Sequence, residues 1–214
     1  LVDTYAKCGS LFQAHKIFCE MPKRDVVTWS TIISGYVQQG EELHALNLFV
    51  QMQAEDVKPT KTVISCILKA CGNLGALQEG FFIHDFTIKL GLDDDSIIGN
   101  TFVYIYSKCQ CLKEAHNMFG RLLSKDVVSS SALICGYIEN GKTGIALELF
   151  RRVLLQGVKP DKGIYICSLN ACCDTQNLPI GRMIHYSLIS IQEELDFEAG
   201  RGLLGMYIRC GSLQ

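Results

Sequence analysis

The sequence lacks the features that mark several well-known classes of protein. Its 214 residues carry a formal net charge of −2, so no overall positive field points to a polyanionic partner. Its longest weakly polar stretch, residues 127–138, is shorter than the roughly 18 apolar residues that a membrane-spanning helix needs. Apolar residues make up 48% and charged residues 20% of the chain, which excludes a disordered tail and a collagen-like fibre. We therefore expect a folded chain of one large or two small domains.

Several motifs typical of enzymes are absent as well. The sequence contains no G-x-S-x-G nucleophile elbow, no H-E-x-x-H zinc motif, and neither the H-x-E nor the P-C-x-x-C of the zinc deaminases. Each of these motifs supplies a nucleophile, a general base or a metal ligand. Without them, we expect the chain to be a binding protein and not an enzyme.

Eleven cysteines are the unusual feature of the composition. Their odd number argues against a fully paired disulfide framework, and the absence of C-x-x-C excludes a standard zinc ribbon or thioredoxin motif. Cys66 with Cys71, and Cys167 with Cys172, leave a metal site as the alternative. Five residues on a helix correspond to a rotation of about 500°, so the members of each pair diverge. We expect buried thiols in a reducing compartment, with no metal and no other cofactor.

The sequence repeats itself at an interval of 101 residues. The motif Y-A-K-C-G-S-L at 5–11 returns as Y-S-K-C-Q-C-L at 106–112 and as Y-I-R-C-G-S-L at 207–213. At this offset 38 of 113 aligned pairs are identical without a gap. The histidines follow the same interval, His15 with His116 and His84 with His185. A catalytic residue is rarely duplicated at a structural period, so we expect these histidines to pack.

Recurring markers divide the repeat into units of 35, 35 and 31 residues. Each unit contains two stretches of helical spacing, and in the first of them Gly40 ends one helix and the V-K-P at 57–59 ends the other. One helix pair cannot bury its apolar stripe alone, so neighbouring units must stack into a solenoid. The predicted complete units are residues 26–60, 61–95, 96–126, 127–161 and 162–196, with partial units 1–25 and 197–214 at the ends.

The beginning and the end of the chain carry no structural or targeting signal of their own. The sequence does not begin with methionine, opens at Leu1 within a helical pattern and stops at Gln214 just as another helix would begin. We expect the chain to be part of a longer protein. A missing targeting segment therefore says nothing about location.

The units resemble the pentatricopeptide repeat. The resemblance lies in V-T-W-S-T-I-I-S-G-Y at 27–36, A-L-N-L-F at 45–49 and V-K-P at 57–59. The rotation of 35-, 35- and 31-residue units is similar to the plant PLS subclass, with canonical, long and short repeats. Tetratricopeptide repeats fit less well, because they keep a constant period of about 34 residues. The resemblance implies an all-α fold, a right-handed α-solenoid superhelix of helix-turn-helix repeats.

The resemblance also implies a function. Proteins of this family bind single-stranded RNA, about one base per repeat, each base being read by two or three side chains. The subclass further implies an organellar plant protein, in a mitochondrion or a chloroplast, that takes part in RNA editing or processing with partner proteins and without a membrane. The alternative is a protein–protein interaction scaffold that uses the same solenoid surface.

Within each unit, the resemblance implies that one residue near the start of the first helix and the last residue of the unit select the base. Asn100 with Asp126 should favour U, because an amide can pair with a pyrimidine edge, and Ser131 with Asp161 should favour G. We expect the selectors to be exposed, and their alternative role is to cap a helix. The implied pairs are Ser30 with Thr60, which hints at a purine, Ser65 with Asp95, Asn100 with Asp126, Ser131 with Asp161, and Ile166 with Asp196, which should read nothing.

Other residues are expected to support the contact with RNA. Val27, Ile97 and Val128, three positions before a selector, should pack against bases. The single tryptophan, Trp29, lies in an apolar helix stripe and should belong to the core, with stacking on a base as the alternative. Two sets of cations could track phosphates or complement helix dipoles. These sets are Lys7, Lys108 and Arg209, and Lys58 with Lys159.

Overall fold

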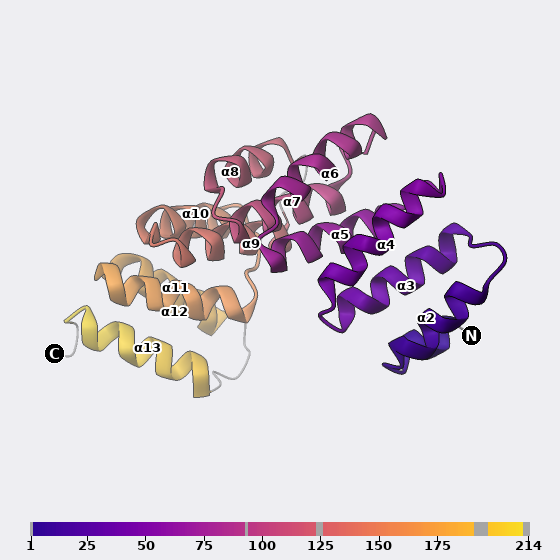
Figure 1. Cartoon of the computed structure of the whole chain (residues 1–214). Helices are drawn as coiled ribbons and strands as arrows, with labels where there is room; N and C mark the ends of the chain where they lie inside the picture. Colours follow the sequence, from indigo (N-terminus) through magenta and orange to yellow (C-terminus); the bar gives the residue numbers. More distant parts are fainter. Residues whose placement is uncertain (1, 93, 123–125, 191–196, 212–214) are drawn as a thin grey trace. The chain divides into compact units, whose positions relative to one another are not determined.

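The computed structural model describes residues 2–92, 94–122, 126–190 and 197–211, and these residues form thirteen α-helices and no strand (Figure 1). The predicted all-helical fold class is thereby confirmed. The helices fall into two compact units, Leu1–Cys111 and Leu112–Gln214. Among the described helices, none is both long enough and apolar enough to cross a membrane.

The first unit is a row of helical hairpins. Helix α3 contacts α1, α4 and α5, and α5 in turn contacts α6 and α7, so the first helices of successive hairpins form a layer of their own (Figure 1). The helices of this unit are α1 (Val2–Lys7), α2 (Leu11–Glu20), α3 (Val26–Gln38), α4 (Glu42–Ala54), α5 (Lys61–Leu74), α6 (Leu77–Lys89) and α7 (Ser96–Lys108).

The second unit repeats this arrangement. Helix α9 contacts α8, α10 and α11, and α11 contacts α12 and α13. The helices of this unit are α8 (Leu112–Arg121), α9 (Val127–Glu139), α10 (Thr143–Leu155), α11 (Lys162–Thr175), α12 (Leu178–Ser190) and α13 (Phe197–Arg209).

Glycine ends the first helix at two corresponding points of the repeat. Gly40 follows α3 with φ of 75° and Gly141 follows α9 with φ of 68°. Both values lie in the left-handed region, which a residue without a Cβ adopts readily. The chain therefore turns at these points and starts the second helix of the hairpin, as the spacing predicts.

At one corresponding turn the repeat departs from this rule. Gly75 ends α5 with φ of 67°, whereas Gln176, 101 residues later, ends α11 with φ of 51°. A side chain in this region costs roughly 1–2 kcal/mol, which Gln176→Gly would remove. Part of this gain is lost because glycine has more conformational freedom in the unfolded chain. Gln176→Gly should therefore stabilise the fold by about 0.5–1 kcal/mol. Urea unfolding followed by circular dichroism measures the change. The matched control is the reverse exchange, Gly75→Gln, which should destabilise by a similar amount; equal stabilities for both variants and the parent would contradict the argument.

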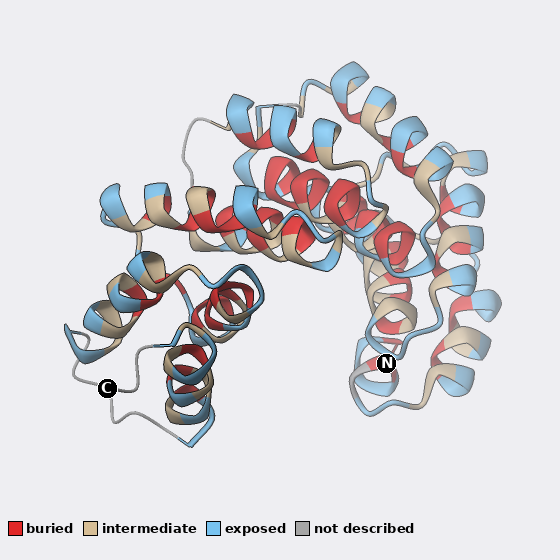
Figure 2. Ribbon diagram, turned by 90° about the vertical axis from the view of Figure 1, so that its left-hand side faces the viewer, coloured by how far each residue is buried: buried red, intermediate tan, exposed pale blue. Residues whose placement is uncertain are grey.

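The core consists of the helix faces that are turned toward neighbouring helices (Figure 2). Trp29 is fully buried there, as predicted, with its ring 4.7 Å from that of Phe18 at an angle of 77°. Ile32, Ile33 and Met52 are fully buried in the same unit. Each unit thus has its own apolar layer between the first and second helices.

The histidines belong to this packing. In four places a histidine Nδ1 lies within hydrogen-bond distance of a tyrosine hydroxyl on the next first helix. The separations are 3.0 Å for His15 and Tyr36, 2.7 Å for His84 and Tyr106, 3.0 Å for His116 and Tyr137, and 2.8 Å for His185 and Tyr207. His44 stacks on Tyr36 at the surface. The histidines therefore join successive hairpins, in agreement with the prediction that they pack.

Candidate nucleic-acid interface

The last residue of each complete unit within the described residues caps the first helix of the next unit. The caps are Thr60 Oγ1, which accepts from Val63 N at 3.3 Å; Asp95 Oδ1, from Ile97 N at 3.0 Å and Ile98 N at 3.2 Å; Asp126 Oδ1, from Ser129 N at 2.9 Å; and Asp161 Oδ1, from Ile164 N at 2.9 Å. Capping fixes the start of the helix and uses one carboxylate oxygen of each aspartate. The second oxygen of these aspartates can then take part in another contact.

In one pair that second oxygen meets the expected partner. The hydroxyl of Ser131, on the first turns of α9, donates to the carbonyl of Val127 and lies 3.4 Å from Asp161 Oδ2. Ser131 is half-buried and Asp161 is exposed. The structure therefore brings these two predicted selectors together, although they are 30 residues apart in the sequence.

The other pairs in the first unit are engaged differently. The hydroxyl of Ser30 donates to the carbonyl of Val26 at 2.6 Å, while Thr60 caps α5. Asp95 forms an ion pair with Lys61 at 2.5 Å, and the hydrogen bond from Lys61 is the main reason why the pKa of Asp95 lies below its ordinary value. Lys61 thus occupies the second oxygen of Asp95, the place that Asp161 offers to Ser131.

The side chain of Ser65 also differs from expectation. Ser65 as a whole is half-buried. Its hydroxyl oxygen is buried and, within the described part of the chain, has no hydrogen-bond partner. A hydroxyl in this state cannot present itself to solvent in the same way as an exposed selector. Its predicted partner Asp95 lies in the same unit and is bound to Lys61.

Asn100 corrects the expectation that all selectors are exposed. Its side chain lies on α7 and is only 9% exposed, within a run of buried residues from Ile98 to Val103. Asp126, its predicted partner, is exposed and belongs to the second compact unit. Asp196, the predicted partner of Ile166, lies outside the described residues.

The three residues predicted to pack against bases are exposed apolar side chains. Val27 is 66%, Ile97 is 63% and Val128 is 64% exposed, each on the first turn of its helix. A β-branched side chain in water at the same place in three units is available for contact with a planar partner. Their role stays a prediction.

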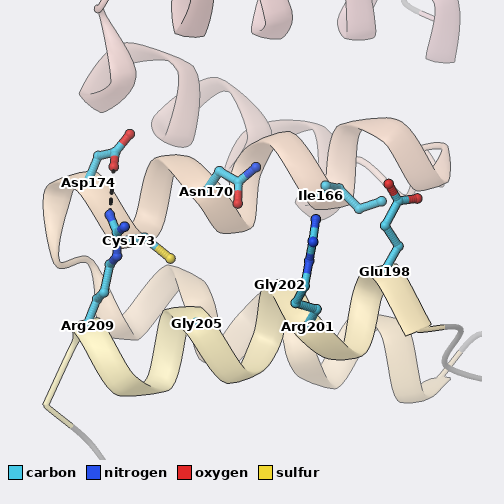
Figure 3. A pocket seen from close by; sticks show the side chains of 9 residues that line it. All are labelled: Ile166, Asn170, Cys173, Asp174, Glu198, Arg201, Gly202, Gly205 and Arg209. Atoms are coloured by element: carbon cyan, nitrogen blue, oxygen red, sulfur yellow. Dashed lines mark hydrogen bonds and ion pairs between the residues drawn. The ribbon is translucent and has the colours of Figure 1, made fainter.

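A pocket of about 300 Å³ lies between α11 and α13 (Figure 3). Arg209 lies at one end, 3.5 Å from Asp174, and at the other end Glu198 forms an ion pair with Lys162 at 3.6 Å. Between them Arg201 rises from α13 toward Ile166 (Figure 3). Arg201 stands 101 residues after Asn100, at a position that corresponds to a predicted selector, although it is not among the predicted pairs.

The cation sets are only partly available. Lys58 and Lys159 are exposed, Lys108 is exposed at the end of α7, and Arg209 lies within 3.5 Å of Asp174. The side chain of Lys7 lies outside what the structure describes. Their contact with phosphates stays a prediction.

One motif was overlooked in the sequence. Residues 136–143 read G-Y-I-E-N-G-K-T and match the phosphate-loop pattern G-x-x-x-x-G-K-[ST]. That pattern binds phosphate when it follows a strand and opens a helix. Here it spans the last turn of α9 and the start of α10, with Gly136 buried in the helix. Its backbone amides are therefore used by a helix, and the match carries no nucleotide site.

The expectation of buried thiols holds for only some of the cysteines. Cys71 and Cys172 are buried, and burial raises the pKa of each to about 12. Cys8 and Cys19 are exposed, and the others are half-buried. Among the described residues, no group of three histidine, cysteine or acidic side chains converges as metal ligands would.

Models of the pentatricopeptide repeat match this sequence in three places. The repeat family model matches residues 24–73, and the repeat model matches residues 1–26 and 128–158. The first two matches lie in the N-terminal units, and the third covers most of the unit at 127–161. These matches overlap the segments on which the resemblance was based.

Proteins of Arabidopsis thaliana are similar to the chain over its whole length. It is 35% identical over 211 residues to a chloroplastic pentatricopeptide repeat-containing protein, covering 99% of this chain and 34% of the relative. It is 37% identical over 213 residues to a mitochondrial one, covering 100% of this chain and 34% of the relative. The chain thus spans about a third of the length of these relatives.

Two solved structures share the fold. The pentatricopeptide repeat protein PPR10, in complex with an 18-nt psaJ RNA element, has a TM-score of 0.74 at 19% identity over 99% of this chain and 32% of that chain. The pentatricopeptide repeat domain of Arabidopsis thaliana protein-only RNase P 1, in complex with tRNA, has a TM-score of 0.67 at 15% identity over 82% of this chain and 95% of that chain. Both are helical-repeat solenoids. In fold, this chain is a helical-repeat solenoid, and in sequence its residues 1–73 and 128–158 match models of the pentatricopeptide repeat.

Proposed function

We propose that the chain binds single-stranded RNA without catalysis, one unit contacting about one base. The observation that carries the proposal is the geometry of Ser131 and Asp161, whose hydroxyl and carboxylate oxygens lie 3.4 Å apart. Asp161 caps α11 with one oxygen and faces Ser131 with the other, so the two side chains are held in place together. A hydroxyl whose one proton is directed to Val127 or Asp161 still has a lone pair that can accept a hydrogen bond from a base edge.

Neighbouring residues make the same surface suitable for a base. Val128 precedes Ser131 by almost one turn of α9 and is 64% exposed, so it offers an apolar contact to the face of a base. By the pairing of selectors with bases that the family resemblance implies, Ser131 with Asp161 should read G. Asn100 with Asp126 should read U, and Ser30 with Thr60 a purine. The low exposure of Asn100 means that it needs a local adjustment before it can meet a base.

The division into units supports assignment to the PLS subclass. The complete units at 26–60, 61–95, 96–126, 127–161 and 162–196, and the partial unit at 197–214, each start at the first residue of a helix, α3, α5, α7, α9, α11 and α13 respectively. The unit at 96–126 is four residues shorter than the two before it, and its second helix α8 is correspondingly short, with 10 residues against 13 in α4 and α6. These lengths follow the canonical, long and short rotation of that subclass.

The names of the relatives support a location of this chain in a plant organelle. Those most similar over the whole chain include proteins named chloroplastic and mitochondrial, which fits a plant organelle and a role in RNA editing or processing. Any catalytic step would belong to another part of the full protein or to a partner protein. The neighbours in complex with RNA and tRNA fit the same class of ligand.

The test compares RNA strands of one sequence in single-stranded and duplex form. Fluorescence anisotropy with the 214-residue chain should give tighter binding to the single strand, because bases paired in a duplex cannot be read. The duplex is the matched control, since it carries at least as much charge. Equal affinity for both forms would mean that only phosphates are bound, and no binding to either would overturn the proposal.

The scaffold remains the second candidate because of one specific surface. A groove between α4 and α6 is lined mainly by apolar side chains, among them Phe49, Val50 and Phe82. Val50 is 62% and Phe82 is 61% exposed. These residues lie on second helices, away from the selectors on the first helices, so a protein could occupy this groove while RNA occupies the other helices.

A further inference from the structure

Two cysteines occupy corresponding positions on adjacent first helices of the second unit. Cys135 lies on α9 and Cys167 on α11, and these two helices are in contact. The positions 101 residues earlier hold Ser34 and Cys66, whose Oγ and Sγ atoms are 3.4 Å apart. The repeat therefore brings the side chains at these two positions together, and in the second unit both of them end in sulfur.

The two thiols interact directly. A hydrogen bond from the thiol of Cys135 lowers the pKa of Cys167 below its ordinary value and raises the pKa of Cys135. Burial and the nearby carboxylates of Glu139 and Asp161 act against this lowering. Both cysteines are only half-buried, so a small solute can reach them. Cys167 thus has the properties of an attacking thiolate, and Cys135 those of a resolving thiol.

The position of the pair links it to the proposed RNA surface. Cys135 follows Ser131 by four residues, about one turn of α9, and so lies on the same side of the helix. Cys167 follows the selector position Ile166 on α11. A bond between the sulfurs would hold α9 and α11 together beside the pair Ser131 and Asp161.

We propose that Cys135 and Cys167 are a redox modification site, at which glutathione disulfide converts the two thiols into one intramolecular disulfide. The Cys167 thiolate attacks one sulfur of glutathione disulfide, whose S–S bond breaks and releases one glutathione thiolate. Cys135 then gives up its proton, and its sulfur attacks Cys167 in the mixed disulfide. The second glutathione leaves, so two cysteines are oxidised while one glutathione disulfide is reduced to two glutathione molecules.

The disulfide itself does not depend on the proposed function, but its effect on RNA does. A disulfide needs a sulfur–sulfur bond of about 2.05 Å, so the two helices must approach slightly from their hydrogen-bonded separation. We expect the oxidised chain to bind single-stranded RNA less tightly, because α9 and α11 can no longer adjust to a base. Reduction should restore the affinity.

The experiment treats the 214-residue chain with glutathione buffers of increasing oxidised fraction, alkylates the remaining thiols and maps the peptides by mass spectrometry. The expected product is a peptide pair joined between Cys135 and Cys167, with the loss of both thiols. Cys66 is the internal control. Its neighbour Ser34 has no sulfur, so Cys66 should carry at most a mixed disulfide with glutathione.

Two variants make the result specific. Cys135→Ser reproduces the arrangement of Ser34 with Cys66, and should leave glutathione on Cys167 without a cross-link. Cys167→Ser should make Cys135 react more slowly, and circular dichroism checks that both variants remain helical. Glutathione on both cysteines of the parent chain without a link, or a link from Cys167 to another cysteine, would overturn the proposal. Because the cross-link is measured before RNA is added, failure of RNA binding by the reduced chain would count against the proposed function alone.

Discussion

Trp29→Ala should lower the free energy of unfolding of the first unit by roughly 3–5 kcal/mol, the usual cost of removing a large aromatic side chain from a core. Trp29 is fully buried, packs edge-on against Phe18 at 4.7 Å and lies beneath the guanidinium of Arg24, 5.6 Å from the ring. The cavity would sit between α2 and α3, where the first hairpins meet. Urea unfolding followed by circular dichroism measures the loss, and hydrogen exchange should place it in α1–α4.

The repeat supplies a matched control for this variant. Ser130 stands 101 residues after Trp29, is also buried, and within the described residues its hydroxyl has no hydrogen-bond partner. Ser130→Ala removes a buried polar group and little volume, so it should be neutral or stabilising. A loss below about 1 kcal/mol for Trp29→Ala would show that the indole does not fill the core.

Affinity for single-stranded RNA should fall roughly 50-fold when salt is raised from about 50 to 200 mM. Each phosphate contact contributes about 0.7 to the slope of log affinity against log salt for a single strand, and about four contacts give this change. Arg201 is exposed in the pocket between α11 and α13, where Arg209 is already held by Asp174. Arg201→Gln should therefore reduce the slope by about 0.7.

The control for Arg201 is a cation on a second helix. Lys113 is exposed on α8, so Lys113→Gln changes the net charge equally without touching a first helix. Its slope should stay that of the parent chain. Equal reductions for both variants would mean that RNA responds only to total charge, and a salt-insensitive affinity would exclude phosphate contacts.

The sequence was sufficient for features that depend on local chemistry and on the repeat. Gly40 and Gly141 turn the chain where the helical spacing stops, and Asp161 caps α11 at the predicted unit boundary. The burial of Trp29 also follows from an apolar stripe that recurs at helical spacing. Such features are decided within one unit, so a single sequence contains the information.

Contacts between units were harder to predict. Asn100 was expected to be exposed but is 9% exposed, and the helix that carries it, α7, packs against α5 and α6. Asp95 bonds to Lys61, 34 residues away, whereas Asp161 faces Ser131. The sequence contains both aspartates at equivalent positions, and only packing decides which neighbour reaches the second carboxylate oxygen. Arg201 could have been found from the 101-residue interval, since it stands where Asn100 stands one repeat earlier.

The central claim is that side chains on the first helices read bases, and Ser131→Asn tests it most directly. A competition experiment measures the binding of the chain to two single-stranded RNAs. The RNAs differ only at the two recognised bases, which are UG in one and UU in the other. The parent should prefer UG, and Ser131→Asn should prefer UU. Each preference should be about fivefold, since the exchange of one or two hydrogen bonds amounts to about 1 kcal/mol. Ser30→Asn, at the same position 101 residues earlier but with Thr60 as its partner, is the control and should leave this choice unchanged. A reversal of preference in Ser131→Asn alone supports the claim, whereas an equal weakening of both RNAs, or no change in either, would contradict it.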